Sequence, residues 1–217
     1  AQVYDNAQVY DNAQVYGSAQ VYGEAWVYGS ARVYGEARVH GSAQVYGDAQ
    51  VYDSARIYSD AQVYGDAQVC SNAQVCGSAK VYDGAWVYDS AQVYGSAQVY
   101  GDAQVCGNAM VYDNALVYGN AQVCGNAQVC NGAQIQSTEN VLVIGPVGRR
   151  NDFVTFYMGS GKNIMVKCGC FHGTIREFLM KVKETHGCGR HALVYQAAAE
   201  TAYRQIGLWD TDCGGHL

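Results

Sequence analysis

Apolar and polar positions follow one another along the first 132 residues with a fixed period of six. The chain reads AQVYDN, AQVYDN, AQVYGS and continues through twenty-two such hexads without an insertion. Ala fills the first position of every hexad, and Val fills the third position in every hexad except the one that contains Ile57. An α-helical face recurs every 3.6 residues, so this period excludes a helix.

The hexad instead predicts a short strand followed by a corner. Side chains alternate along a strand, so Ala and Val point inward while the residues at the second and fourth positions point outward. The fifth and sixth positions hold mostly Gly, Asp, Asn, Ser and Glu. Gly, Asn and Asp tolerate the left-handed backbone of a sharp corner. No hexad can bury its own apolar face, so stability must come from coils stacked at about 4.8 Å.

The repeated pattern V-x-x-x-A-x, which continues into Ala133-Gln134-Ile135, resembles the hexapeptide-repeat left-handed β-helix family. The resemblance implies a left-handed parallel β-helix, an all-β solenoid, with three hexads per coil. About seven coils would then form a rod of roughly 35 Å. The residues alone leave the coil size open, because a flattened coil of two hexads also suits an Ala/Val core.

The period ends at 136–138, which predicts a β-helix over residues 1–138 and an α+β cap domain over 139–217. Residues 141–144 predict a buried strand that ends at Gly145-Pro146. Two further strands, over 153–158 and 163–167, predict a hairpin around the segment GSGK.

Two helices are expected to complete the cap domain. Thr174 and Glu177 have the spacing of a capping box, and apolar residues then recur at helical spacing until Gly187. A second helix is predicted over about 191–206. Its apolar positions include Ala192, Tyr195, Ala199 and Ile206.

The stretches V-T-F-Y (154–157), C-G-C-F-H-G-T-I-R-E-F (168–178), K-V (181–182) and T-H-G (185–187) resemble a small ββα-type domain. Such domains are appended to the C-terminal end of hexapeptide-repeat proteins of bacteria and their phages, and the resemblance implies no activity. We expect the domain to cover the open strand edges of the rod. Ala1 opens directly into a full hexad, so this end is expected either to lack its true terminus or to stack on another surface.

Charge is distributed unevenly between the two regions. Residues 1–132 hold ten Asp and two Glu against three Arg and one Lys, a net charge of −8, whereas residues 133–217 carry +2. An acidic rod repels phosphate backbones, so nucleic acid is not an expected partner. No apolar run approaches the roughly 20 residues that cross a bilayer, so membrane insertion is not expected.

His40 is the one candidate for catalysis in the repeat. Many proteins of the hexapeptide-repeat family are acyltransferases, and the resemblance implies a histidine near a subunit interface beside loops that interrupt the coils. No loop interrupts any coil here, and His40 stands where Tyr stands in most other hexads. We therefore interpret His40 as a neutral surface substitution rather than a general base.

Cysteine and histidine residues are concentrated in the last fifty residues. Cys-x-Cys-x-His followed by His-x-Cys-x-x-His offers soft ligands for tetrahedral zinc, although the spacing is not that of a standard knuckle. The alternative is a pair of buried thiols on one strand, and the sequence favours it. The candidate ligands are Cys168, Cys170, His172, His186 and Cys188, with His191, Cys213 and His216 nearby. No other cofactor is expected.

Five cysteines replace Tyr in the repeat, at positions 70, 76, 106, 124 and 130. With three hexads per coil, Cys106 and Cys124 would be stacked neighbours close enough to be bridged. We nevertheless expect free thiols in a reducing compartment. With no signal peptide recognised, a cytoplasmic or virion-associated protein is expected, or an extracellular one if the N-terminus is processed.

The outward Tyr and Gln columns are the most unusual feature of the chain. Ladders of identical side chains stabilise a stack, and they also make flat amphipathic faces on which another rod could pack. We expect a non-enzymatic rod that forms a homo-oligomer or filament, or that scaffolds a partner, with a possible protein partner at the C-terminal domain. An acyltransferase and a protein that sequesters a small ligand are the alternatives. The predicted interaction surface comprises Tyr4, Tyr10, Tyr16, Tyr22, Tyr28, Tyr34, Tyr46 and Tyr52.

Overall fold

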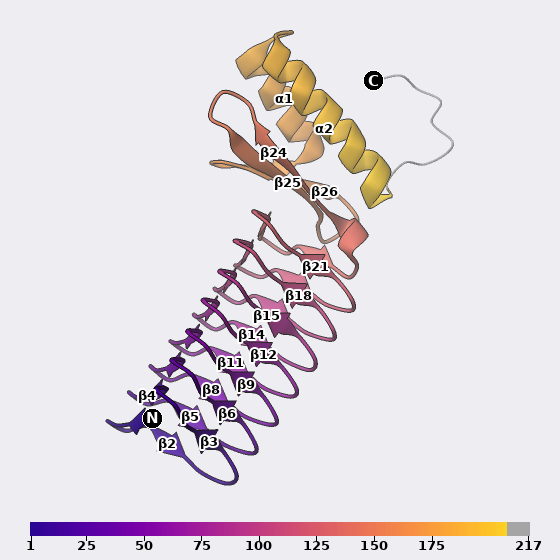
Figure 1. Cartoon of the computed structure of the whole chain (residues 1–217). Helices are drawn as coiled ribbons and strands as arrows, with labels where there is room; N and C mark the ends of the chain where they lie inside the picture. Colours follow the sequence, from indigo (N-terminus) through magenta and orange to yellow (C-terminus); the bar gives the residue numbers. More distant parts are fainter. Residues whose placement is uncertain (208–217) are drawn as a thin grey trace.

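The computed structural model describes residues 1–207. It contains a rod of stacked coils that is closed at one end by a small domain of four strands and two helices (Figure 1). In the described part of the chain, no helix is long and apolar enough to span a membrane.

Each hexad of the rod forms one two-residue strand at its second and third positions. Strand β1 pairs in parallel with β4, so Gln2 lies beside Gln20, eighteen residues later. This register holds along the rod and confirms three hexads per coil and about seven coils, and it excludes the two-hexad coil.

The strands form three parallel sheets, one for each face of the rod. The first contains β1 (Gln2–Val3), β4 (Gln20–Val21), β7 (Arg38–Val39), β10 (Arg56–Ile57), β13 (Gln74–Val75), β16 (Gln92–Val93), β19 (Met110–Val111) and β22 (Gln128–Val129). The second contains β2 (Gln8–Val9), β5 (Trp26–Val27), β8 (Gln44–Val45), β11 (Gln62–Val63), β14 (Lys80–Val81), β17 (Gln98–Val99), β20 (Leu116–Val117) and β23 (Gln134–Ile135). The third contains β3 (Gln14–Val15), β6 (Arg32–Val33), β9 (Gln50–Val51), β12 (Gln68–Val69), β15 (Trp86–Val87), β18 (Gln104–Val105) and β21 (Gln122–Val123).

The inward and outward assignment of the hexad is confirmed. From Ala19 to Ile135, every Ala at the first position and every Val or Ile at the third position is completely buried. The corners have positive φ at the fifth position, as at Gly65 and Asp83. A Cβ on Gly65 would lie 2.9 Å from the backbone nitrogen of Asp83 in the next coil, so the corners stack almost as tightly as the strands.

The C-terminal domain is a four-stranded antiparallel sheet in the order β24-β25-β26-β27, covered by two helices. A short 3-10 helix, η1 (Thr138–Asn140), leads into it. The elements are β24 (Val141–Val147), β25 (Asp152–Met158), β26 (Ile164–Cys168), β27 (Phe171–Thr174), α1 (Ile175–His186) and α2 (Arg190–Ile206). The hairpin, both helices, the Thr174–Glu177 capping box and the stop at Gly187 were all predicted and are confirmed.

Two details of the predicted cap domain are wrong. The first strand does not end at Gly145-Pro146 but continues to Val147, which is possible because β24 is an edge strand and Pro needs no ladder partner on its open side. Only Val141 of its apolar run is fully buried. The sequence analysis also missed β27, because Gly169 turns the chain back directly after Cys168.

The sheet of the cap domain lies between the rod end and the two helices. Val141 and Tyr157 belong to the core that runs through the rod, whereas Val154 and Phe156 pack against the helices. Alternation along β25 therefore sends one side chain to each core in turn, and this fixes the domain on the last coil.

The Ala/Val core generates the first prediction. Val63 is buried between Val45 and Val81, so Val63→Asp should place an unpaired carboxylate inside the rod and destabilise it by about 3–5 kcal/mol. Gln62→Asp, on the outward neighbour, should change the thermal melting point little. Melting by circular dichroism tests both, and wild-type-like melting of Val63→Asp would contradict the inward assignment.

Candidate functional site

The fourth position of each hexad forms one outward column on each face of the rod. The rings in a column stack face to face at the pitch of the coils, as between Tyr10 and Tyr28, whose centroids are 5.1 Å apart with parallel planes. Tyrosine hydroxyls also reach the Gln of the next coil, and Tyr82 donates to Oε1 of Gln98 at 3.2 Å. Because neighbouring rings cover each other's faces, the columns present ring edges and hydroxyl groups to the outside.

The three columns are not equivalent. The predicted surface residues are spread over all three, with Tyr4 and Tyr22 on the first face and Tyr16, Tyr34 and Tyr52 on the third. The first column is interrupted by His40, Cys76 and Cys130, and the third by Cys70, Cys106 and Cys124. The second column is uninterrupted, and we call it the second-face ladder. It comprises Tyr10, Tyr28, Tyr46, Tyr64, Tyr82, Tyr100 and Tyr118, with centroid spacings of 4.8–5.2 Å.

Burial raises the pKa of the ladder tyrosines that lie between two others. For Tyr82 the neighbouring Tyr100 and the carboxylate of Asp83 raise the pKa further. Tyr64 and Tyr100 are raised by burial, by their neighbouring rings and by the same Asp83. Asp83 therefore lies close enough to influence three rings of the ladder.

His40 lies in the first column between two tyrosines. Its ring stacks on Tyr22 at 4.7 Å and on Tyr58 at 5.3 Å. Burial lowers the pKa of His40, and Arg38 and Arg56 on the same face lower it further. The coil is continuous around it, so the arrangement gives the acyltransferase interpretation no support and agrees with a substitution within the column.

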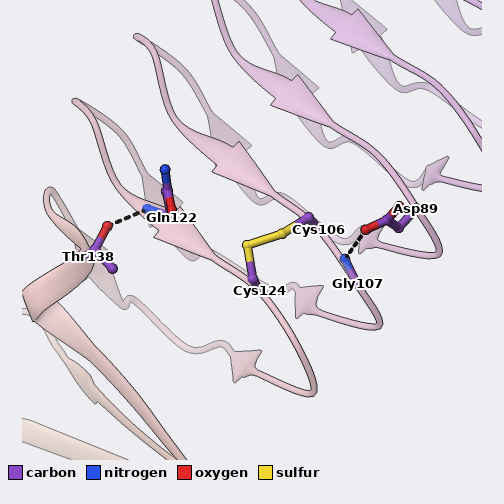
Figure 2. The surroundings of a disulfide bond; sticks show 6 residues. All are labelled: Asp89, Cys106, Gly107, Gln122, Cys124 and Thr138. Carbon is purple, nitrogen blue, oxygen red and sulfur yellow. Dashed lines mark hydrogen bonds between the residues drawn. A yellow bond between two sulfur atoms is a disulfide. The ribbon is translucent and has the colours of Figure 1, made fainter.

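The third column contains a disulfide bond between Cys106 and Cys124 (Figure 2). The expectation of free thiols is wrong for this pair. Their eighteen-residue spacing places them in adjacent coils of one sheet, with Cα atoms 4.6 Å apart. Cys70, Cys76 and Cys130 remain free, because their column neighbours are not cysteines.

The end of the rod is closed by hydroxyl groups of the cap domain. Along the rod, backbone N–H groups donate to carbonyl groups of the following coil, as from Gln104 to Ala121. The last strands of the third and first sheets, β21 and β22, have no following strand in their sheets, and an N–H group of each donates to a side chain instead. Gln122 donates to Oγ1 of Thr138 at 3.1 Å (Figure 2), and Gln128 donates to Oγ1 of Thr155 at 3.0 Å.

Tyr157 and His172 add a hydrogen-bond network to this junction between the rod and the cap domain. The Tyr157 hydroxyl lies 3.3 Å from the thiol of Cys130 and 2.9 Å from Nε2 of His172, while Nδ1 of His172 lies 3.3 Å from the amide nitrogen of Asn131. Because the amide nitrogen donates, Nδ1 accepts and Nε2 carries the proton. Burial raises the pKa of Tyr157, and the hydrogen bond that its hydroxyl donates to the sulfur of Cys130 raises the pKa further. Cys130 is 1% exposed, so the network joins the two domains and offers no thiol to an outside substrate.

The structure separates most of the candidate metal ligands. Cys168 ends β26 and is half-buried beside the helices, Cys170 is exposed in the following turn, and Cys188 is exposed between α1 and α2. His186 lies at the end of α1 beside His191, with ring centroids 5.8 Å apart. Within residues 1–207, no group of three or more His, Cys, Asp or Glu side chains is placed to hold a metal. Cys213 and His216 lie outside the described residues.

The expectation that both thiols of the C-G-C stretch are buried is wrong for Cys170. Strand β26 ends at Cys168, and the positive φ of Gly169 turns the chain before Cys170. The two residues therefore do not alternate along one strand. Burial raises the pKa of Cys168, and Asp152 raises it further.

A possible protein partner was predicted for the C-terminal domain, and this domain has a groove along its two helices. It has a volume of about 340 Å³ and is lined by Leu179, Met180, Lys183, Gln196 and Glu200. Met180 is 65% exposed, and Leu193 on α2 is 60% exposed. A partner at this groove stays a prediction.

Comparison with known proteins places the rod among repeat solenoids. A family model described as the YdcK β-solenoid repeat matches residues 1–17, 7–23, 19–35, 31–47, 43–59, 103–119 and 111–125. The chain is a β-solenoid repeat protein. No curated protein and no solved structure matches it.

The solenoid register explains what the sequence analysis missed. Reading the chain in steps of eighteen rather than six separates the second-face ladder from the two interrupted columns. The cap-domain hydroxyls that close the solenoid could not be found in this way, because Thr138 and Thr155 lie outside the repeat.

The closure of the solenoid generates the second prediction. Thr155 is 1% exposed, so Thr155→Val should leave the N–H of Gln128 without an acceptor and destabilise the fold by roughly 1–3 kcal/mol. Thr138→Val is the matched control, because both Thr138 and Gln122 are exposed and water can replace the lost hydroxyl. Denaturant unfolding measures both variants, and equal losses would contradict this account of the junction.

The environment of His40 generates the third prediction. A folded-state pKa below the unfolded value means that the unfolded chain binds the proton more readily, so stability is lost as pH falls below about 6.5. His40→Tyr should remove this contribution and restore the column. The difference in melting temperature between about pH 7.5 and about pH 5 should therefore be smaller in the variant. An unchanged difference would contradict the lowered pKa, and a fall in melting temperature at both pH values would contradict the neutral role of His40.

Proposed function

We propose that this β-solenoid is a non-enzymatic structural protein, a rod that associates with copies of itself through its tyrosine-lined faces. The observation that carries the proposal is the uninterrupted second-face ladder, seven tyrosines in register on a flat parallel sheet. Protein interfaces are enriched in Tyr and depleted in Lys and Glu. The second face has this composition.

The stacking of the rings narrows what such a face can bind. Planar ligands such as sugar rings and nucleobases bind aromatic side chains through the ring faces, and inside a ladder those faces are covered by neighbouring tyrosines. Ring edges and hydroxyls at a spacing of about 4.8 Å suit a surface with the same repeat. A second copy of the rod provides that repeat.

The interior of the rod supports a structural role for a different reason. From Ala19 to Ile135, the inward positions of the hexads hold completely buried Ala, Val and Ile side chains, so these positions contribute no polar side chain to the interior. His40 stands in an outward column, where it is stacked between two tyrosines, and Cys106 is bonded to Cys124 in another outward column. This arrangement favours a rigid structural rod over an enzyme.

The fourth prediction tests self-association directly. The repeat region carries −8, so rods should repel one another at low salt and associate more strongly as salt shortens the Debye length. Sedimentation velocity at roughly ten to a hundred micromolar protein, in low and in high salt, should show dimers or larger species that increase with salt. A purely monomeric protein in both conditions would overturn the proposal.

A further inference from the structure

We propose that two copies of the rod pair side by side and parallel through the second face, with Lys80 of each copy opposite Asp83 of the other. This inference rests on the proposed self-association. It names the surface, the orientation of the two rods and an ion pair that would form across the contact. The occupant of the second face is thus a second copy of this chain.

The second face differs from the other two in its outward second-position column. On the first face this column contains Arg38 and Arg56 in adjacent coils, and on the third face it contains Arg32. On the second face it contains one charged residue, Lys80, together with Trp26, Leu116 and five glutamines. The second face therefore combines the uninterrupted Tyr ladder with two large apolar side chains and a single cation.

Lys80 and Asp83 are both free to pair with another molecule. They lie in the same coil, and neither has an ion-pair partner within residues 1–207. Asp83 stands at a corner with positive φ directly after Tyr82, and its charge is felt by Tyr64, Tyr82 and Tyr100. Its carboxylate is therefore held at the edge of the ladder.

The orientation follows from the order of the columns across the face. A two-fold axis parallel to the rod, running between the second-position and fourth-position columns, places each coil against the same coil of the second copy. The Gln column of one copy then meets the Tyr column of the other, where amides and phenol hydroxyls can hydrogen bond. In the fifth coil this brings Lys80 opposite Tyr82 and Asp83 of the second copy.

Charge disfavours the antiparallel alternative. An antiparallel pair centred on the ladder would bring the acidic corner after the second sheet against itself, with Asp66 facing its own copy and Asp48 facing Asp83. The parallel pair instead places this corner against the one that precedes the second sheet. In the third, fifth and sixth coils that preceding corner carries only Gly and Ser, whereas in the first and fourth coils it places Asp5 near Asp11 and Asp60 near Asp66. The Lys80–Asp83 ion pair adds an attraction that the antiparallel pair lacks, and this attraction favours the parallel arrangement.

The size of the face sets the expected strength. Seven coils by one strand width give a flat contact of roughly 34 by 13 Å. The area of this contact is smaller than the roughly 800 Å² that each partner buries in a standard stable interface. We therefore expect a dissociation constant in the micromolar range. At that strength, replacing an attraction by a repulsion at two symmetric positions should be easy to measure.

The test uses two charge reversals and their mixture. Lys80→Glu places two carboxylates opposite each other, and Asp83→Lys places two ammonium groups opposite each other, so each variant alone should dimerise at least about tenfold more weakly than the wild type. In an equimolar mixture, the introduced glutamate of one variant faces the introduced lysine of the other, while the native Asp83 faces the native Lys80. The mixture should recover affinity to within about threefold of the wild type.

Two further variants act as matched controls. Arg56→Glu changes the same hexad position on the first face, and Asp53→Lys changes the same positive-φ corner position after the third sheet. Both should associate like the wild type when measured by analytical ultracentrifugation near about 0.15 M salt. Thermal melting of every variant checks folding, and the recovery in the mixture shows independently that both charge-reversed rods are folded.

Each outcome separates the face assignment from self-association. Loss in both single variants with recovery in the mixture supports the parallel second-face pair. If the wild type associates but Lys80→Glu does not weaken it, or Arg56→Glu weakens it instead, the face assignment is overturned while self-association stands. If the mixture of two folded variants stays monomeric, the parallel register is wrong, and a monomeric wild type overturns both proposals.

Discussion

The backbone hydrogen bonds between coils determine the rest of this structure. Along the rod, N–H groups donate toward the C-terminal end, as from Gln20 to Ala37, and the register of eighteen residues never changes. This ladder gives each side chain a neighbour of the same hexad position one coil away, so a single residue type becomes a column. It also gives the rod a direction, with unpaired N–H groups at the last coil. The cap domain has to supply acceptors there, and Thr138 and Thr155 do so with hydroxyl oxygens.

Because the core of the rod is narrow, the large and polar side chains of the repeat lie on its outer faces. A coil of three short strands leaves an interior that Ala and Val fill completely, and each is held by contacts above and below rather than across a wide core. Large aromatic side chains cannot enter, so the tyrosines lie on the faces and stack on one another. The stacking stabilises the rod and at the same time fixes the rings in one orientation. A surface ordered in this way loses little conformational entropy when it binds a partner.

Most of the fold could be predicted from the sequence, because every hexad has the same pattern of inward, outward and corner residues. Strands, corners, the Ala/Val core and both cap-domain helices could be predicted, since each depends on residues within a few positions of one another. The missed features depend on contacts between distant residues. Strand β27 is defined by its pairing with β26, and the Tyr157–His172 contact exists only after the cap domain sits on the rod. The coil register predicted that Cys106 and Cys124 are neighbours, but the prediction of free thiols was wrong because it depended on a reducing compartment, which the residues do not determine.

The spacing between successive coils limits which partners the faces of this rod can bind, and it does so more than the residue types do. Seven tyrosines spaced at about 4.9 Å cannot all be engaged by a globular surface of irregular shape, whereas a parallel β-surface of the same spacing engages every one. Matching pitch alone does not choose a face or an orientation, because all three faces share it. The choice falls to the few positions at which the columns differ, and among these Lys80 and Asp83 are opposite charges in one coil. In the proposed pair, the few positions that break the uniformity of the repeat would specify the arrangement of the two rods.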